Sequence, residues 1–222
     1  AAPLGGALTA RFGNVQVCND AMAATWAEYA FGAGTHCTNF VYLTVSTGVG
    51  GGAIVNGQLL QSRRGLAGHF GFVSAPLGLG PCGSGRHATV ESVAGGRAIA
   101  AAAEDIGHAG LSAKAVLDAA EAGAAWARTI ADRAALTIAT LTADLTAAFD
   151  PDRIAIGGGI GRSERFLRQV QAYARAEPDL FQVPIVPAQL DQDGPLLGAL
   201  AWAAKSRRTS ENGRAAVEDH LE

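Results

Sequence analysis

Short apolar runs rich in β-branched residues alternate along this chain with longer segments in which apolar residues recur at helical spacing. The runs Val41–Val45, Ala53–Val55, Ile154–Ile156 and Pro184–Val186 have the length and composition of strands. A strand-like alternation also covers Val15–Asp20 and ends in an Asn-Asp pair. These segments predict a sheet whose strands are separated by helices.

Helical spacing dominates the segments between the predicted strands. The segments expected to form helices are Ala21–Phe31, Glu91–Ala103, Ser112–Ala122, Ala124–Phe149, Ser163–Ala176 and Leu196–Ala204. In the longest of these segments, apolar side chains recur at Trp126, Ile130, Leu136, Leu141 and Leu145, which indicates a buried face. Strands that alternate with helices are typical of an α/β fold.

Composition narrows the function classes. The chain has 222 residues, which allow one large or two small domains, and 49% of them are hydrophobic. A net charge of −3 argues against nucleic-acid binding, for which a basic face would be expected. Three cysteines without a framework pattern suit a reducing compartment, and neither a signal peptide nor a membrane span is evident. We therefore expect a cytoplasmic α/β protein with no membrane or nucleic-acid partner.

The most informative segment is the glycine-rich stretch Ser46–Gly52, which follows the predicted strand Val41–Val45. Its glycines offer backbone N–H groups without obstruction by a Cβ atom, as close approach to phosphate oxygens requires. The chain then resumes as the strand Ala53–Val55 and a type I′ turn signal at Asn56 and Gly57, so this is not a Walker A loop. Taken alone, an ordinary glycine-rich hairpin is an equally good interpretation of this segment.

A second glycine cluster, Gly157–Gly161, follows the apolar run Ile154–Ile156. Glycines at the carboxyl end of a strand let a ligand lie against bare backbone, in the position where α/β folds bind nucleotides. Alone, this cluster is more simply a tight turn into the predicted helix Ser163–Ala176. Two such turns in one chain favour a nucleotide-binding cleft.

Asp20 ends the strand-like segment Val15–Asp20 and precedes the predicted helix Ala21–Phe31. It could be the N-cap of that helix, a position that Asp often fills. A carboxylate at a strand end beside a phosphate-binding turn could equally take a proton from a sugar hydroxyl during phosphoryl transfer. The sequence alone leaves both roles open.

Taken in order, these segments resemble the ROK family of sugar kinases and related repressors. The motifs that carry the resemblance are Asn19-Asp20-Ala21, Ser46–Gly52, Ala67-Gly68-His69, Cys82-Gly83, Glu91 and Gly157–Gly159, within a match over about Val15 to Ala204. The phrases Trp26–Tyr29 and Gly65–Gly71 are most similar to the subgroup of bacterial N-acetylmannosamine kinases. The resemblance implies the actin/hexokinase (ribonuclease H-like) fold and phosphoryl transfer from ATP to the 6-hydroxyl of N-acetylmannosamine in sialic acid breakdown.

The resemblance also implies a role for each residue of the site. Asp20 would be the catalytic base. The residues expected to bind the sugar are Asn19, His69 and Glu91, and those expected at the nucleotide are Thr47 and Gly48 (phosphates) and Gly158 and Gly159 (adenosine). ATP with Mg²⁺ and a small-molecule sugar are the ligands that the family implies, and a homodimer is compatible with it.

The amino-terminal region departs from the family pattern. Family kinases usually begin with a strand and an Asp-x-Gly-Gly-Thr loop that grips phosphates and magnesium, and no such loop precedes Asp20 here. We therefore expect residues 1–36 to be a remnant of the amino lobe, residues 37–205 the carboxyl lobe and residues 206–222 a mobile tail. Because the phosphate grip would be incomplete, the 222-residue chain is expected to have no measurable sugar kinase activity and at best weak nucleotide binding.

A second departure lies in the segment that binds zinc in the family, a His three residues after the position of His69 followed by three cysteines. The residues at these four positions are Phe72, Cys82, Ser84 and Thr89, so one expected ligand remains. A structural zinc site needs four nitrogen or sulfur donors, and Phe cannot donate at all. We therefore expect zinc to be absent.

Two function classes remain after this comparison. The first is a sugar kinase of the ROK family. The second is a non-catalytic member of the family that binds a sugar or a nucleotide. A repressor is disfavoured, since the sequence shows no amino-terminal helix-turn-helix and its net charge does not suit DNA binding.

Overall fold

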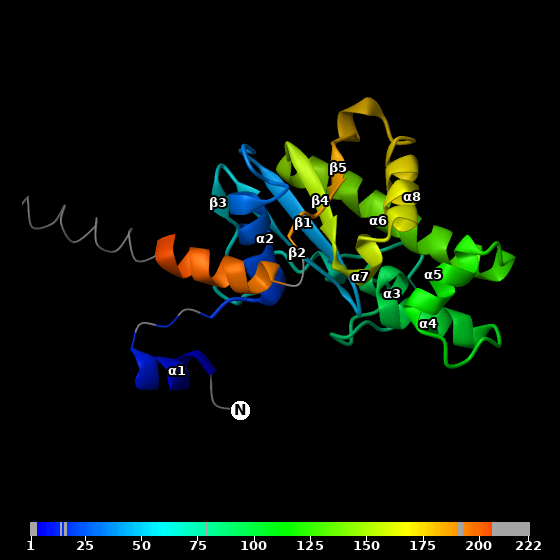
Figure 1. The fold of residues 1–222 in the computed structure, drawn as a ribbon, viewed down its shortest axis with the longest axis horizontal. Coiled ribbons are helices and arrows are strands. Elements are labelled where there is room, and N and C mark those ends of the chain that lie inside the picture. The colour runs from blue at the N-terminus through cyan, green and yellow to red at the C-terminus, as the bar shows by residue number, and fades with distance from the viewer. Residues whose placement is uncertain (1–3, 14, 16, 79, 191–192, 206–222) are drawn as a thin grey trace, which may run out of the picture.

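The computed structural model describes residues 4–13, 15, 17–78, 80–190 and 193–205. Their strands form one five-stranded mixed sheet in the order β3-β2-β1-β4-β5 (Figure 1). The central strand β1 (Phe40–Val45) pairs antiparallel with β2 (Val49–Val55) and parallel with β4 (Arg153–Gly157). The edges are β3 (Gln58–Leu59) and β5 (Ile185–Pro187). The expected α/β fold is confirmed.

The antiparallel side of the sheet confirms the predicted turn and corrects the predicted strand. Asn56 and Gly57, with φ angles of 50° and 72°, form the tight turn between β2 and β3 that the type I′ signal predicted. The second strand begins at Val49, not at Ala53, so the segment Gly50–Gly52 lies inside β2 and not in the turn.

Helix α2 (Asp20–Phe31) explains why β2 contains glycine. A Cβ atom at Gly52 would lie 3.0 Å from Cβ of Thr25, and one at Gly50 would lie 3.3 Å from Cβ of Ala21. The glycines therefore let α2 pack directly on the sheet. These two positions serve the close approach of a helix, whereas the sequence suggested the close approach of a phosphate.

Helices cover both faces of the sheet (Figure 1). One face carries α2 and the helical residues 194–205, where Trp202 packs edge to face on Trp26 of α2 with 5.1 Å between ring centroids. The other face carries the larger core, formed mainly by the long helix α6 (Ala125–Phe149) and by α8 (Glu164–Ala174). Leu136, which the apolar pattern placed on the buried face of α6, is 40% exposed, and alanines form most of that face instead.

The helices predicted between Glu91 and Ala122 are present, one of them in two pieces. A single helix was expected over Glu91–Ala103, but α3 (Glu91–Ala94) and α4 (Gly96–Asp105) are separated by Gly95, whose ψ of 149° is extended. Helix α5 (Ala113–Glu121) begins after Ser112, whose hydroxyl accepts a hydrogen bond from the N–H of Ala115 at 3.2 Å, as predicted for an N-cap. The short helical turns are η1 (Phe70–Phe72), α7 (Gly158–Gly161) and η2 (Asp179–Phe181).

The amino-terminal region differs most from the expectation. Residues 15 and 17–19 are not a strand, because no neighbouring strand of the described residues pairs with them. An unpredicted helix, α1 (Leu4–Phe12), has no buried residue and lies apart from the sheet in Figure 1. The boundary expected at residue 36 stays a prediction, although α2 packs on β1 and β2.

The expected mobile tail, residues 206–222, lies outside the described residues. Within the described part of the chain, the three cysteines are free thiols. No helix of that part combines the length and the apolar character needed to cross a lipid bilayer.

Candidate functional site

The two predicted glycine turns lie next to each other at one end of the sheet. Because β1 and β4 are parallel neighbours, with Thr44 opposite Gly157, both strands end at the same edge. The turn Ser46–Gly48 leads out of β1 and is closed by a hydrogen bond of 2.9 Å from the N–H of Ser46 to the carbonyl of Gly48. Helix α7 begins at Gly158, directly after β4. The structure therefore brings together the residues expected at the nucleotide.

Gly158 requires the conformational freedom of glycine. Its φ is +84°, and a Cβ atom there would lie 2.7 Å from Oγ1 of Thr44. At Gly159, by contrast, a Cβ atom would meet nothing within 4 Å among the described atoms beyond its chain neighbours. Gly158 therefore holds its turn close against β1, while Gly159 leaves open space where a ligand can approach the backbone.

Asp20 is the first residue of α2, and Asn19 is the N-cap of that helix. The Asn19 Oδ1 atom accepts a hydrogen bond of 2.8 Å from the N–H of Ala21, and Asp20 Oδ1 accepts from the same N–H at 2.8 Å. Ala21 packs over Gly50 of β2, so Asp20 stands at the same end of the sheet as the turn Ser46–Gly48. The Asp20 side chain is exposed, and the N-cap role considered for it belongs to Asn19.

His69 lies in a loop that packs on strand β2, near the turn Ser46–Gly48. A Cβ atom at the adjacent Gly68 would lie 3.0 Å from the carbonyl oxygen of Gly51 in β2. The His69 ring stacks on Phe72 with 5.5 Å between centroids, and its Nδ1 atom lies 3.2 Å from the carbonyl oxygen of Leu66. Phe72 therefore provides a stacking surface for His69.

Glu91 joins two loops at the start of α3. Its Oε2 atom accepts a hydrogen bond of 3.1 Å from the N–H of Val49, and its Oε1 atom accepts one of 2.9 Å from the N–H of Gly83. A Cβ atom at Gly48 would lie 3.0 Å from the Glu91 carboxyl carbon. Glu91 is therefore next to the residues expected at the phosphates, and both of its carboxylate oxygens already accept backbone hydrogen bonds.

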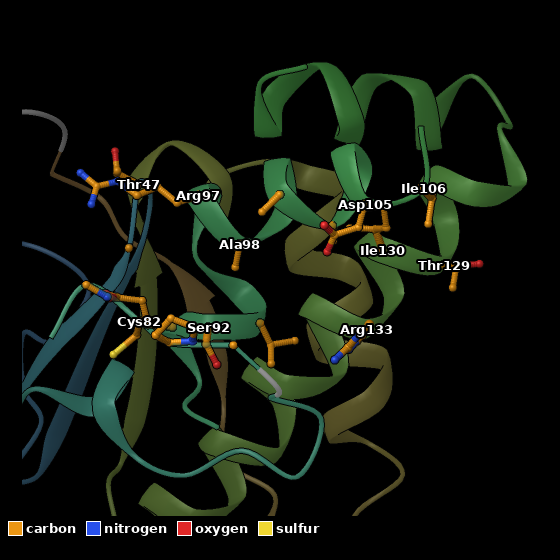
Figure 2. Close-up of a pocket in the computed structure, with 18 of the residues that line it drawn as sticks. Thr47, Cys82, Ser92, Arg97, Ala98, Asp105, Ile106, Thr129, Ile130 and Arg133 are labelled. Atoms are coloured by element: carbon orange, nitrogen blue, oxygen red, sulfur yellow. The ribbon is translucent and has the colours of Figure 1, made fainter. Parts of the chain in front are cut away.

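A cavity of about 880 Å³ opens beside the turn Ser46–Gly48 and extends between α4 and α6 (Figure 2). Its lining combines alanines of α4 with a few polar and charged side chains, and includes Thr47, Gly48, Cys82, Glu91, Arg97, Asp105, Trp126 and Arg133. Its volume lies within the usual range of small-molecule sites, about 300–1,000 Å³. The cavity is therefore large enough for a ligand that also touches the turn.

Sequence reasoning missed a polar group on the face of the sheet that α2 covers. Tyr42 and Thr44 are two residues apart on β1 and lie on this face, where the Tyr42 hydroxyl is hydrogen-bonded to Thr44. Burial raises the pKa of the Tyr42 hydroxyl. The Thr44 hydrogen bond and the charge of Arg162 oppose this shift, and the negative charges of Glu28 and Asp20 add to it. The period-two alternation of a strand could have indicated that both residues share this face.

The residues at the expected zinc ligand positions do not fit a structural zinc ion. Phe72 stacks on His69 and has no donor atom, while Cys82 Sγ lies 3.0 Å from the hydroxyl oxygen of Ser84. Partial burial acts to raise the pKa of the Cys82 thiol, but hydrogen bonds from Ser84 and Thr89 outweigh it and hold the pKa below its ordinary value. Zinc would need three further nitrogen or sulfur donors, in place of the Phe72 ring and the hydroxyl groups of Ser84 and Thr89.

Arg86 ties this loop together with direct hydrogen bonds. Its Nη1 atom donates to the carbonyl of Phe72 at 2.5 Å and its Nη2 atom to the hydroxyl of Ser74 at 2.9 Å. The carbonyl of Arg86 accepts a hydrogen bond of 2.8 Å from the N–H of Cys82. Beside it, Pro81 and His87 form an isolated antiparallel β-bridge. These bonds link the two ends of the loop without a metal ligand.

We predict that the purified protein contains no stoichiometric zinc and that its melting temperature does not change with a strong chelator. The reason is that side-chain and backbone hydrogen bonds replace the metal in the loop that Arg86 joins. Elemental analysis by mass spectrometry, together with a thermal melt with and without chelator, measures both quantities. One zinc ion per chain would show that the prediction is wrong.

Comparison with known proteins shows which family this chain belongs to. The model of the ROK family matches residues 1–206 of this chain. The chain is 44% identical over 190 residues to an N-acetylmannosamine kinase of Yersinia pestis (strain Pestoides F). That match covers 85% of this chain and 64% of the relative, so the chain spans less than two thirds of the relative's length.

Solved structures agree with the sequence match. The ROK hexokinase from Thermus thermophilus aligns with a TM-score of 0.83 at 31% identity, over 89% of this chain and 67% of that one. A ROK family glucokinase from Streptomyces griseus, solved in complex with glucose and AMPPNP, aligns with a TM-score of 0.76 at 30% identity, over 89% of this chain and 70% of that one. The chain therefore belongs to the ROK family and has the actin/hexokinase fold of its kinases.

Proposed function

We propose that the protein containing this chain is an ATP-dependent sugar kinase that phosphorylates N-acetylmannosamine on its 6-hydroxyl, as a step in the cytoplasmic breakdown of sialic acid. The observation that supports this most is that an exposed carboxylate, Asp20, stands at the same end of the sheet as the two glycine turns. The identity of 44% to an N-acetylmannosamine kinase supports the choice of sugar.

In this proposal the nucleotide lies across the carboxyl ends of β1 and β4. The phosphates would contact backbone N–H groups of the turn Ser46–Gly48 and the hydroxyl of Thr47. The adenosine would lie against the open backbone of Gly159. The glucokinase that aligns with this chain carries AMPPNP, an ATP analogue, which supports a nucleotide in this fold. Mg²⁺ is expected to enter with the phosphates, because it commonly needs only one or two protein carboxylates in such sites.

Asp20 is the proposed general base. Its carboxylate is exposed at the first turn of α2, and the structure gives its Oδ2 atom no hydrogen-bond partner within the described residues. It is therefore available to accept the proton of the sugar 6-hydroxyl as that oxygen attacks phosphorus. Asn19 accepts the N-cap hydrogen bond through Oδ1, which leaves its amide N–H₂ group available to donate to a sugar hydroxyl.

One observation favours the second candidate, a non-catalytic protein that binds a sugar or a nucleotide. Two residues expected at the sugar already have other contacts: both carboxylate oxygens of Glu91 accept backbone hydrogen bonds, and His69 stacks on Phe72. A sugar would have to add to these contacts or displace them. Displacement would reduce sugar affinity and favour nucleotide binding without turnover.

A coupled assay of ADP release separates the two candidates. We expect the protein, expressed from its native reading frame, to release ADP with N-acetylmannosamine at a rate in the usual enzyme range, about 1–10³ per second. N-Acetylglucosamine and glucose at equal concentration are expected to give lower kcat/KM. Calorimetric binding of ATP without any sugar-dependent ADP release would favour the non-catalytic candidate.

A further inference from the structure

Arg97 is held at the edge of the turn Ser46–Gly48 by the first turn of α4. The N–H of Gly96 donates to the carbonyl of Ser46 at 2.7 Å, and the N–H of Arg97 donates to the carbonyl of Thr47 at 3.1 Å. These two bonds fix the backbone of Arg97 relative to the turn. The position of its side chain is therefore linked to the place proposed for the phosphates.

Arg97 is an exposed residue, and its guanidinium is available to bind a ligand. Within the described residues it makes no hydrogen bond and no ion pair, and it lines the cavity of about 880 Å³ together with Thr47 and Gly48. Figure 2 shows Arg97 and Thr47 at one end of this cavity and Arg133 at the other. Arg133 differs because its guanidinium donates to the carbonyl of Leu77.

Within the described residues, the acidic groups that share the cavity form no ion pair with Arg97. Both carboxylate oxygens of Glu91 accept backbone hydrogen bonds, from Val49 and Gly83. Asp105 lies at the opposite end of the cavity, with Arg133 (Figure 2). Among the described residues, the turn Ser46–Gly48 thus has beside it a cation that makes no ion pair, and the cavity lining next to it includes alanines of α4.

We propose that Arg97 is a phosphate-binding residue, whose guanidinium contacts the terminal phosphates of a nucleotide held at the turn Ser46–Gly48. The inference rests on the proposed nucleotide site. Arginine presents a planar, permanently charged set of donors that matches phosphate oxygens in a bidentate manner, and a lysine supplies the charge without that geometry. Arg97 would stabilise both the bound ATP and the negative charge that develops on the departing ADP.

Calorimetric titration with ATP, ADP and adenosine tests this role in the protein expressed from its native reading frame. We expect Arg97→Gln to weaken ATP and ADP binding roughly 10–100-fold, the value of a charge-assisted hydrogen bond, and to leave adenosine binding unchanged. Arg97→Lys should restore part of the loss. Arg133→Gln removes the same charge from the far end of the same cavity and should change ATP affinity by less than about twofold if only charge near the turn matters.

The outcomes separate this inference from the proposed function. If the unchanged chain binds ATP and Arg97→Gln binds it equally well, the Arg97 inference is wrong and the nucleotide site stands. An equal loss of adenosine affinity would assign Arg97 a structural role and would also overturn the inference. If the unchanged protein from its native reading frame binds neither ATP nor adenosine at millimolar concentration, the nucleotide site and the role of Arg97 are both wrong.

Discussion

Replacing Asp20 by Asn is expected to lower kcat roughly 10²–10⁴-fold, the usual contribution of a general base, while sugar binding is largely kept. The carboxamide has almost the same shape as the carboxylate, and the helix start is preserved because Asn19 provides the N-cap. What disappears is the group that accepts the proton of the sugar hydroxyl. Because that interaction strengthens in the transition state, kcat and kcat/KM should fall together.

Steady-state kinetics of the protein expressed from its native reading frame, with N-acetylmannosamine as the varied substrate, measure this effect. Asp105→Asn is the matched control, since it removes an exposed carboxylate of α4 at the far end of the cavity from the turn Ser46–Gly48. The control should keep kcat within about twofold, as a surface substitution away from the reaction does. Near-normal turnover in Asp20→Asn would remove Asp20 from the role of base.

Replacing Glu28 by Ala is expected to lower the free energy of unfolding by about 3 kcal/mol or more. Glu28 lies on α2 and is 1% exposed, and its carboxylate accepts hydrogen bonds from the N–H groups of Ala33 at 2.8 Å, Gln189 at 3.2 Å and Leu190 at 2.7 Å. The substitution leaves these three donors without their acceptor; the Ala33 bond is buried and the other two are part-buried, and an unpaired buried donor costs about 1–3 kcal/mol. Glu28 therefore joins α2 to the segment that follows β5.

Urea denaturation followed by circular dichroism measures this loss. Glu104→Ala, at an exposed position of α4, is the control and should change the free energy of unfolding by less than about 0.5 kcal/mol. A loss below about 1 kcal/mol in Glu28→Ala would mean that water or a shifted backbone satisfies the three donors. Since Asp20 begins the same helix, a shift of α2 in Glu28→Ala should also change nucleotide-dependent turnover.

Local patterns predicted most elements of the fold, because each element has its own period and its own end signals. The turn at Asn56 and Gly57, the cap at Ser112 and the strand before Gly157 are examples. The segment Val15–Asp20 has strand spacing but pairs with no strand of the described residues, so the prediction of a strand there was wrong. Strand formation depends on a neighbour, which a local pattern cannot supply.

The site could be predicted only in part, for the same reason. Thr47 and Gly158 were singled out from separate glycine clusters, and the parallel pairing of β1 with β4 brings them together. The contacts of Glu28 with residues more than 160 positions later carry no signal in the sequence. The sequence carries no signal for the role of Arg97 either, because its position next to Thr47 arises from the break between α3 and α4 at Gly95.

The most direct test of the proposed function is identification of the product that the protein, expressed from its native reading frame, forms from Mg²⁺-ATP and N-acetylmannosamine. We expect a sugar monophosphate whose phosphorus couples to the two protons on C6 in a proton–phosphorus NMR spectrum, and we expect its formation to be lost in Asp20→Asn. Binding of ATP with no phosphorylated sugar in the spectrum, or phosphate on a different hydroxyl, would contradict the account.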